Sequence, residues 1–253
     1  FQALDQRLGS VHLIFAHFWP PNRKLPKFRL KNISNSCSCK KIVACLSIFL
    51  IILTPICENG TFLTVKPTLR DVYDQFAATY EANRGLFDMT PVLNPFFAGL
   101  RKARGRLLDL GCGAGEPFPR YFLDRGWEVV GVDFSANMLR LAARYAPEMR
   151  AICADMTEVE FAPAQFDAIT CIYALFHVPR ARHPELFAKF RRWLRPGGQV
   201  LFTYATQDYT GADEFEGEKE FMGQRLFYSH TTPETLRGQL ADAGLAVRAW
   251  DFR

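Results

Sequence analysis

The first 66 residues contain almost no acidic side chains. Only Asp5 and Glu58 are acidic there, against nine lysines and arginines, so this segment carries a net charge of +7. The other 22 basic and 24 acidic residues give residues 67–253 a net charge of −2. Nucleic-acid binding relies on clustered Lys and Arg that displace counterions from phosphates. The overall charge of +5 therefore does not indicate a nucleic-acid-binding surface on residues 67–253, and we expect no nucleic-acid partner.

The cysteines lack the spacing of a zinc site. Cys37 and Cys39 are separated by a single residue, and Cys45 and Cys57 follow without histidines nearby that would complete a ligand set. We therefore expect no metal site.

Residues 1–66 also differ from the rest in composition. They hold six of the nine lysines but only three of the 22 arginines, and the first methionine of the chain is Met89. Their hydrophobic run, residues 42–57, is 16 residues long, whereas a membrane span needs about 20. Two interpretations stay open, a genuine membrane anchor and a translated segment foreign to the enzyme. We expect the second, with a single domain at residues 67–253 and a cytoplasmic location.

A glycine-rich turn follows the hydrophobic stretch Leu107–Leu110. Gly111, Gly113 and Gly115 stand at alternate positions, and a second hydrophobic strand ends at Asp133 about twenty residues later. Glycines at such a turn allow positive φ and let a ligand approach the backbone. A carboxylate at the end of the next strand can accept hydrogen bonds from ribose hydroxyls. Together these features predict a pocket for a nucleoside-bearing cofactor.

The glycine spacing and the charges indicate which cofactor. Dinucleotide binding requires G-x-G-x-x-G, but this turn reads G-x-G-x-G. Asp109 and Glu116 flank the turn, and two carboxylates would repel a phosphate. They would favour a cofactor that carries an ammonium or a sulfonium.

The stretch Asp109–Gly115 (DLGCGAG) resembles motif I of the class I S-adenosylmethionine-dependent methyltransferases. The resemblance extends over residues 67–253. It implies a Rossmann-like, doubly wound α/β fold with a mainly parallel sheet and helices on both faces. The family's final strand is missing from this sequence, so we expect the strand at Gln199–Tyr204 to be an unprotected sheet edge. Residues 195–198 (RPGG) are predicted to end the preceding helix.

The resemblance also implies which residues hold S-adenosylmethionine. Asp155 would receive the adenine amino group. Tyr73 and Tyr80, on a helix predicted at residues 71–81, would close over the methionine end, although their spacing equally fits the apolar stripe of an amphipathic helix. The complete predicted set is Tyr73, Tyr80, Asp109, Gly111, Cys112, Gly113, Gly115, Asp133, Phe134, Met138, Asp155, Met156 and Cys171.

The predicted activity is methyl transfer from S-adenosylmethionine to a small organic acceptor by in-line displacement. An Asn-Pro-Pro-Tyr motif, which serves amide or base nitrogens, is absent after the fourth strand, where residues 173–176 (YALF) stand instead. His177 is the candidate general base, with structural packing as its alternative role. Two alternative functions remain, a non-catalytic or damaged cofactor-binding domain and a membrane-anchored methyltransferase.

Overall fold

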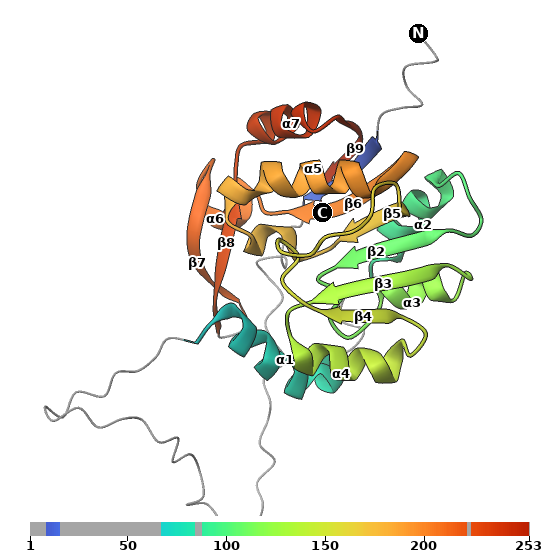
Figure 1. The fold of residues 1–253 in the computed structure, drawn as a ribbon. Coiled ribbons are helices and arrows are strands. Elements are labelled where there is room, and N and C mark those ends of the chain that lie inside the picture. Colours follow the sequence, from blue (N-terminus) through green and yellow to red (C-terminus); the bar gives the residue numbers. More distant parts are fainter. Residues whose placement is uncertain (1–8, 16–66, 84–87, 222–223, 253) are drawn as a thin grey trace, which may run out of the picture. The chain divides into compact units, whose positions relative to one another are not determined.

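The computed structural model describes residues 9–15, 67–83, 88–221 and 224–252. Within them, seven parallel strands form one sheet in the order β4-β3-β2-β5-β6-β1-β9 (Figure 1). The predicted doubly wound α/β class is therefore confirmed. The strands are β1 (Gly9–Phe15), β2 (Arg106–Leu110), β3 (Glu128–Asp133), β4 (Arg150–Cys153), β5 (Phe166–Cys171), β6 (Leu194–Tyr204) and β9 (Leu245–Phe252).

Helices cover both faces of the sheet, because neighbouring side chains of a strand point to opposite sides. In β2, Leu107 belongs to the apolar core that includes residues of α2, α3 and α4, whereas Leu108 belongs to the core built with α5 and α7. The helices are α2 (Thr90–Gly99), α3 (Phe118–Leu123), α4 (Ala136–Tyr145), α5 (His183–Trp193) and α7 (Pro233–Asp242).

The strand β6 is not an open edge, so that expectation was wrong. β1 lies between β6 and β9 and runs parallel to both, with Ser10 opposite Gln199 and Phe15 opposite Tyr204. Gly9–Phe15 thus occupies the sheet position that the sequence left empty. Residues 16–66, with the hydrophobic run 42–57, lie outside the described residues. The domain boundary at residue 66 stays a prediction, but Gly9–Phe15, which precede it, pair within the sheet of residues 67–253.

Residues 195–198, which were predicted to end a helix, also belong to a strand. α5 ends at Trp193, and β6 begins at Leu194, which pairs with Phe166. Residues 195–198 are an irregular first part of β6, because the register shifts before Ala168 pairs with Gln199. Gly197 has a φ of +77° there, a conformation that glycine adopts without strain.

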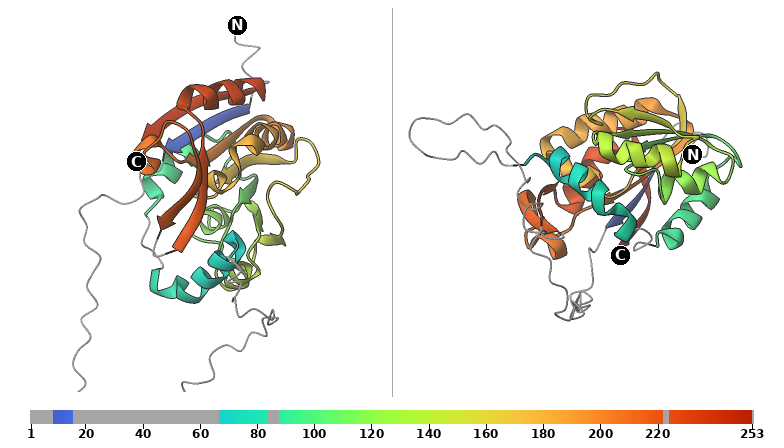
Figure 2. Two further views of the ribbon diagram at one scale, coloured as in Figure 1. Left: turned by 90° about the vertical axis from the view of Figure 1, so that its left-hand side faces the viewer. Right: turned by 90° about the horizontal axis from the view of Figure 1, so that it is seen from below.

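Two elements stand at the carboxyl ends of the parallel strands. One is the helix α1 (Leu69–Asn83), and the other is the antiparallel hairpin of β7 (Phe215–Phe221) and β8 (Gln224–His230), which follows the short helix α6 (Gln207–Thr210). Figure 1 shows both on the side toward which the strand arrows point, and the hairpin faces the viewer in the left view of Figure 2. Ligands of open parallel sheets bind at this edge.

Candidate functional site

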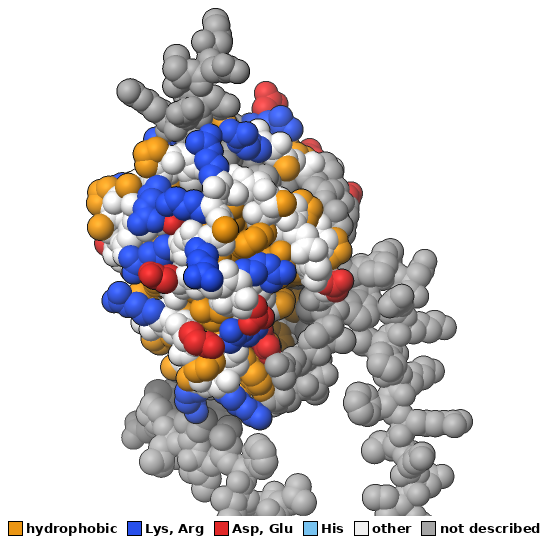
Figure 3. Space-filling view, turned by 90° about the vertical axis from the view of Figure 1, so that its right-hand side faces the viewer, with side chains coloured by type: hydrophobic (Ala, Val, Ile, Leu, Met, Phe, Trp, Pro, Cys, Tyr) orange, Lys and Arg blue, Asp and Glu red, His pale blue; other side chains and the backbone are white. Residues whose placement is uncertain are grey.

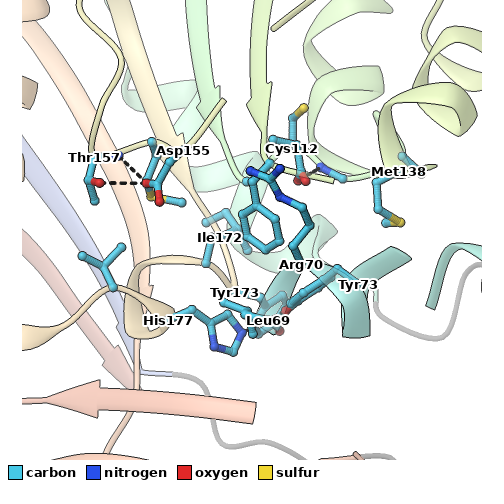
Figure 4. Close-up of a pocket in the computed structure, with 18 of the residues that line it drawn as sticks. Leu69, Arg70, Tyr73, Cys112, Met138, Asp155, Thr157, Ile172, Tyr173 and His177 are labelled. Atoms are coloured by element: carbon cyan, nitrogen blue, oxygen red, sulfur yellow. Dashed lines mark hydrogen bonds between the residues drawn. The ribbon is translucent and has the colours of Figure 1, made fainter. Parts of the chain in front are cut away.

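A cavity of about 860 Å³ opens at the carboxyl edge of the sheet. Its wall is built from the glycine turn after β2, the ends of β3 and β4, the segment after β5 and the helix α1 (Figure 4). The volume lies within the range of small-molecule sites, about 300–1,000 Å³. Eleven predicted site residues line this cavity: Tyr73, Tyr80, Gly111, Cys112, Gly113, Asp133, Phe134, Met138, Asp155, Met156 and His177.

The glycine turn shows why its residues must be small. Gly111 and Gly113 have φ values of +77° and +51°, which side chains rarely adopt. A Cβ atom on Gly111 would clash with the side chain of Ala174. The turn therefore brings bare backbone to the cavity wall.

Asp133 closes β3 and is tied to that turn. Its Oδ2 accepts from the backbone N–H of Gly113 at 2.8 Å, and its Oδ1 accepts from the N–H of Ser135 at 2.8 Å. Burial raises the pKa of Asp133, while these two N–H groups oppose the rise and the nearby charge of Asp74 adds to it. Each carboxylate oxygen has a further lone pair, so Asp133 can still accept from a ligand's hydroxyl groups.

Asp155 follows β4 and forms the opposite part of the wall. Its Oδ1 accepts from the backbone N–H and the hydroxyl of Thr157, both at 2.8 Å, as the dashed lines in Figure 4 show. Met156 and Ile172, both buried, line the cavity beside it. A carboxylate next to apolar walls suits a flat heterocycle that carries an amino group.

His177 and Tyr73 form a hydrogen-bonded pair on the cavity wall. The Nδ1 atom of His177 lies 2.6 Å from the carbonyl oxygen of Phe227, which can only accept, so Nδ1 carries the proton. Its Nε2 therefore accepts from the hydroxyl of Tyr73 at 2.9 Å. Burial lowers the pKa of His177 to about 4. The imidazole is thus neutral at pH 7, with its basic nitrogen directed at Tyr73.

The helix α1 is fastened over the cavity by Asp74. Its Oδ1 accepts from the hydroxyl of Ser135 at 2.5 Å and from the N–H of Asn137 at 3.3 Å. The hydroxyl of Ser135 also caps α4 by accepting from the N–H of Met138. At the other end of the helix, the hydroxyl of Tyr80 donates to Glu116 beside the glycine turn, at 3.4 Å. These contacts place the aromatic side of α1 against the cavity.

Three predicted cofactor residues do not line the cavity. Asp109 is buried at the end of β2, where its Oδ1 accepts from the hydroxyl of Thr170 at 2.5 Å and its Oδ2 has no hydrogen-bond partner among the described residues. Burial raises the pKa of Asp109 to about 7. Gly115 packs against Ala142 and Ala146 of the α4 region, and Cys171 is fully buried in the core. These residues support the wall from behind.

The sequence interpretation missed several lining residues. Arg70 and Leu69, at the start of α1, carry no motif that indicates a site. Tyr173 has a φ of +55°, an uncommon conformation that clusters at functional sites, but nothing in its sequence context reveals it. The remaining lining residues outside the predicted set are Thr68, Ala114, Glu116, Phe118, Thr157, Glu158, Ile172, Ala174, Val178, Pro179 and Arg182.

Among the described residues, no helix combines the length and apolar character required to cross a bilayer, and no group of three or more His, Cys, Asp or Glu side chains is arranged to hold a metal ion.

Known proteins are similar to this chain in sequence. Residues 107–198 match a family model described as a methyltransferase domain. The malonyl-[acyl-carrier protein] O-methyltransferase of Enterobacter lignolyticus is 36% identical over 150 residues, which cover 56% of this chain and 58% of that protein. Phosphoethanolamine N-methyltransferase 1 of Triticum aestivum is 32% identical over 150 residues, which cover 56% of this chain and 28% of that protein. The chain thus spans less than two thirds of the length of these relatives.

A solved structure agrees at the level of the fold. The structure of a DhpI–SAM–HEP complex superposes with a TM-score of 0.56 at 22% identity, covering 71% of this chain and 91% of that one. The parallel sheet, the glycine turn and the acidic strand ends define a Rossmann-like α/β domain. By sequence, residues 107–198 are similar to a methyltransferase domain, and the relatives named above are methyltransferases.

Proposed function

We propose that this protein transfers a methyl group from S-adenosylmethionine to a small organic acceptor. The observation that carries the proposal is that one cavity at the carboxyl edge joins the glycine turn, Asp133 and Asp155 to the Tyr73–His177 pair. The relatives named above act on small molecules or carrier-bound acyl groups by their names, which favours an acceptor of this kind.

The cavity wall fits S-adenosylmethionine. Asp133 would accept from the ribose hydroxyls, and Asp155 from the adenine amino group between Met156 and Ile172. Glu116, beside the glycine turn, would face the ammonium of the methionine end. When bound, the cofactor supplies a methyl group on a positively charged sulfur that is already a good leaving group. The protein therefore has mainly to orient the acceptor and exclude water.

Tyr73 and His177 would accept the proton that the methyl acceptor loses. The Tyr73 hydroxyl donates to Nε2 of His177, and its own oxygen can accept from an O–H or N–H group of the acceptor. A proton lost by the acceptor would pass to Tyr73 while the Tyr73 proton passes to Nε2. The carbonyl of Phe227 then stabilises the imidazolium through Nδ1. Its low pKa keeps the imidazole of His177 unprotonated at pH 7, so the lone pair of Nε2 is free of a proton, but it also makes His177 a weaker base than an exposed histidine.

The decisive experiment is a calorimetric titration of the full chain with S-adenosylhomocysteine. We expect saturable binding that falls at least about 100-fold in Asp133→Ala, because two hydrogen bonds to a carboxylate are lost. Glu128→Ala is the matched control, since Glu128 begins the same strand and its side chain is 81% exposed. Failure of the folded wild-type chain to bind would contradict the proposal and favour a damaged domain.

A further inference from the structure

The side chain of Asp155 is exposed, although it lies on the cavity wall. Asp133, the other carboxylate at a strand end of this cavity, is only 8% exposed. An exposed side chain can adopt several rotamers, so packing alone does not fix the direction in which Asp155 accepts a hydrogen bond. Neighbouring groups must hold this carboxylate if it is to meet a ligand in one orientation.

Thr157 holds the carboxylate of Asp155. Its backbone N–H and its hydroxyl both donate to Oδ1 at 2.8 Å (Figure 4). The hydroxyl lies further from Oε1 of Glu158, at 3.1 Å. Among the described residues, no hydrogen bond reaches the other oxygen of Asp155, Oδ2. Oδ2 therefore remains able to accept from a ligand.

Lys189, on α5, holds Thr157 in turn. Its Nζ donates to the carbonyl oxygen of Thr157 at 2.7 Å. The same ammonium lies 3.1 Å from Glu160 and 3.5 Å from Glu185, and the Lys189 side chain is only 12% exposed. An ammonium has three N–H donors, and each of them has an acceptor here. The backbone at Thr157 is thus tied to α5.

The helix α5 is itself anchored in the core. Leu186 and Phe190, three residues before Lys189 and one residue after it, are both buried in the apolar core of the sheet. Close-packed side chains of this kind leave a helix little freedom to shift. A chain of contacts therefore runs from the core through Lys189 and Thr157 to the exposed Asp155.

Arg192, one turn further along α5, lacks this contact. It pairs with Glu160, a carboxylate that Lys189 also meets, and its side chain is 48% exposed. In the part of the chain that the structure describes, it forms no hydrogen bond with Thr157. Lys189 thus differs from its neighbour in holding the backbone beside Asp155.

We propose that Lys189 and Thr157 are positioning residues that make the cavity selective for a base with an amino group. This role rests on the proposed function, in which Asp155 accepts from the adenine amino group. Held by Thr157, the carboxylate presents Oδ2 to that group. A base with a carbonyl oxygen at the same place cannot donate there, and its partial negative charge is repelled by the carboxylate.

The experiment compares two ligands that differ in the group that Asp155 would meet. Calorimetry measures the affinity of the full chain for S-adenosylhomocysteine and for S-inosylhomocysteine, in which a carbonyl replaces the amino group. The wild type should prefer the adenosyl compound about tenfold or more, as expected for a hydrogen bond to a charged acceptor. Lys189→Met keeps an unbranched side chain but loses the ammonium, and it should lower this preference about threefold or more. The affinity for S-inosylhomocysteine should change less than about twofold.

Three further variants test the route of the effect. Thr157→Val removes one of the two donors to Asp155 and should also lower the preference, and it decides the question if Lys189→Met does not fold. Lys189→Arg keeps a cation that can donate to the carbonyl of Thr157 and should retain most of the preference. Arg192→Gln removes an ion pair to Glu160 without touching Thr157 and should retain all of it.

Equal weakening of both ligands in Lys189→Met would indicate a merely structural role and overturn the proposal. An unchanged preference in both Lys189→Met and Thr157→Val would overturn it as well, and so would a wild type that binds the two compounds equally. In each of these cases the wild type still binds S-adenosylhomocysteine. A folded wild-type chain that does not bind S-adenosylhomocysteine would instead contradict the proposed function itself.

Discussion

Two cavities lie at opposite ends of the same strands, and the charged residues that line them differ in their partners. The cavity at the carboxyl ends has a volume of about 860 Å³ and presents Asp133, Asp155 and Arg70 to its interior. The cavity at the amino ends has a volume of about 430 Å³, and its wall is largely charged. Its lining residues are Lys102, Arg104, Gly105, Arg106, Gly126, Glu128, Asp167 and Arg195.

At the amino ends the charges are paired with one another. Asp167 begins β5 and meets Lys102 at 2.8 Å, Arg195 at 2.5 Å and the backbone N–H of Arg106 at 3.0 Å. Burial alone would raise the pKa of Asp167, but these donors and positive charges hold it below the usual value. Figure 3 views the molecule from the side where the strands begin and shows many Lys and Arg side chains there.

The charges at the amino ends therefore stabilise the fold, whereas those at the carboxyl ends can bind a ligand. A carboxylate surrounded by the protein's own donors stabilises the folded state, and its loss leaves those donors unpaired. Carboxylates of the larger cavity, such as Asp133 and Asp155, instead keep lone pairs that can accept hydrogen bonds from a ligand. Substitutions at the carboxyl end should therefore impair function, and substitutions at the amino end should impair stability.

The largest effect is expected at His177. His177→Gln removes the proton acceptor and should lower kcat about 100-fold or more, the range of general base catalysis. Tyr73→Phe interrupts the same relay with little change in packing and should lower kcat to a similar degree. Affinity for S-adenosylhomocysteine, measured on the same samples, should change less than about twofold. If Tyr73→Phe keeps full kcat on an acceptor that must lose a proton, the relay is contradicted.

The stability of the protein should also depend on pH through His177, at the carboxyl ends of the strands. The pKa of His177 is about 4 when folded, against 6.5 for the free side chain. Between these values the unfolded chain binds a proton that the folded chain does not, so the free energy of unfolding falls as pH falls. From pH 7 to 4.5 this loss should be on the order of 2 kcal/mol for His177.

The contribution is isolated by comparing the wild type with His177→Gln in urea at both pH values. Buried His183, whose pKa is also about 4, acts in the same direction. Asp109, with a pKa raised to about 7, acts oppositely, since its folded form keeps a proton that the unfolded form has lost. Both effects persist in the variant and cancel in the difference. An equal loss of stability in the two proteins would show that His177 is not buried as described.

Local sequence signals predicted the sheet and the cofactor half of the site. Leu107, Leu108 and Leu110 form a hydrophobic stretch interrupted only by Asp109, which indicates a strand buried on both faces. Gly113 and Asp133 belong to a motif whose spacing fixes a turn and a strand end. These features can be predicted because the residues that interact are close in sequence or belong to the same strand–helix–strand unit.

The acceptor half could not be predicted in this way. Tyr73 and His177 are 104 residues apart, and only the folded chain shows their 2.9 Å contact. The tautomer of His177 depends on the backbone of Phe227 in the hairpin, which no side-chain pattern encodes. The place of β1 beside β6 is equally a long-range pairing.

The smallest expected effects lie at the amino end and test its structural role. Asp167→Ala leaves the buried N–H of Arg106 and two cations without their acceptor, so it should destabilise the protein by about 2 kcal/mol. Lys102→Gln is the graded control, because its side chain is 55% exposed and an exposed ion pair contributes about 0.5 kcal/mol. Both free energies are measured by urea denaturation at pH 7.

Cofactor binding completes this test. Asp167 lies at the start of β5 and the cavity at the strands' other ends, so S-adenosylhomocysteine affinity should match the wild type in both amino-end variants under folded conditions. A loss of affinity in Asp167→Ala, with stability unchanged, would reverse the assignment of the two ends. A loss of stability alone would show that the paired charges of the amino end act on the fold.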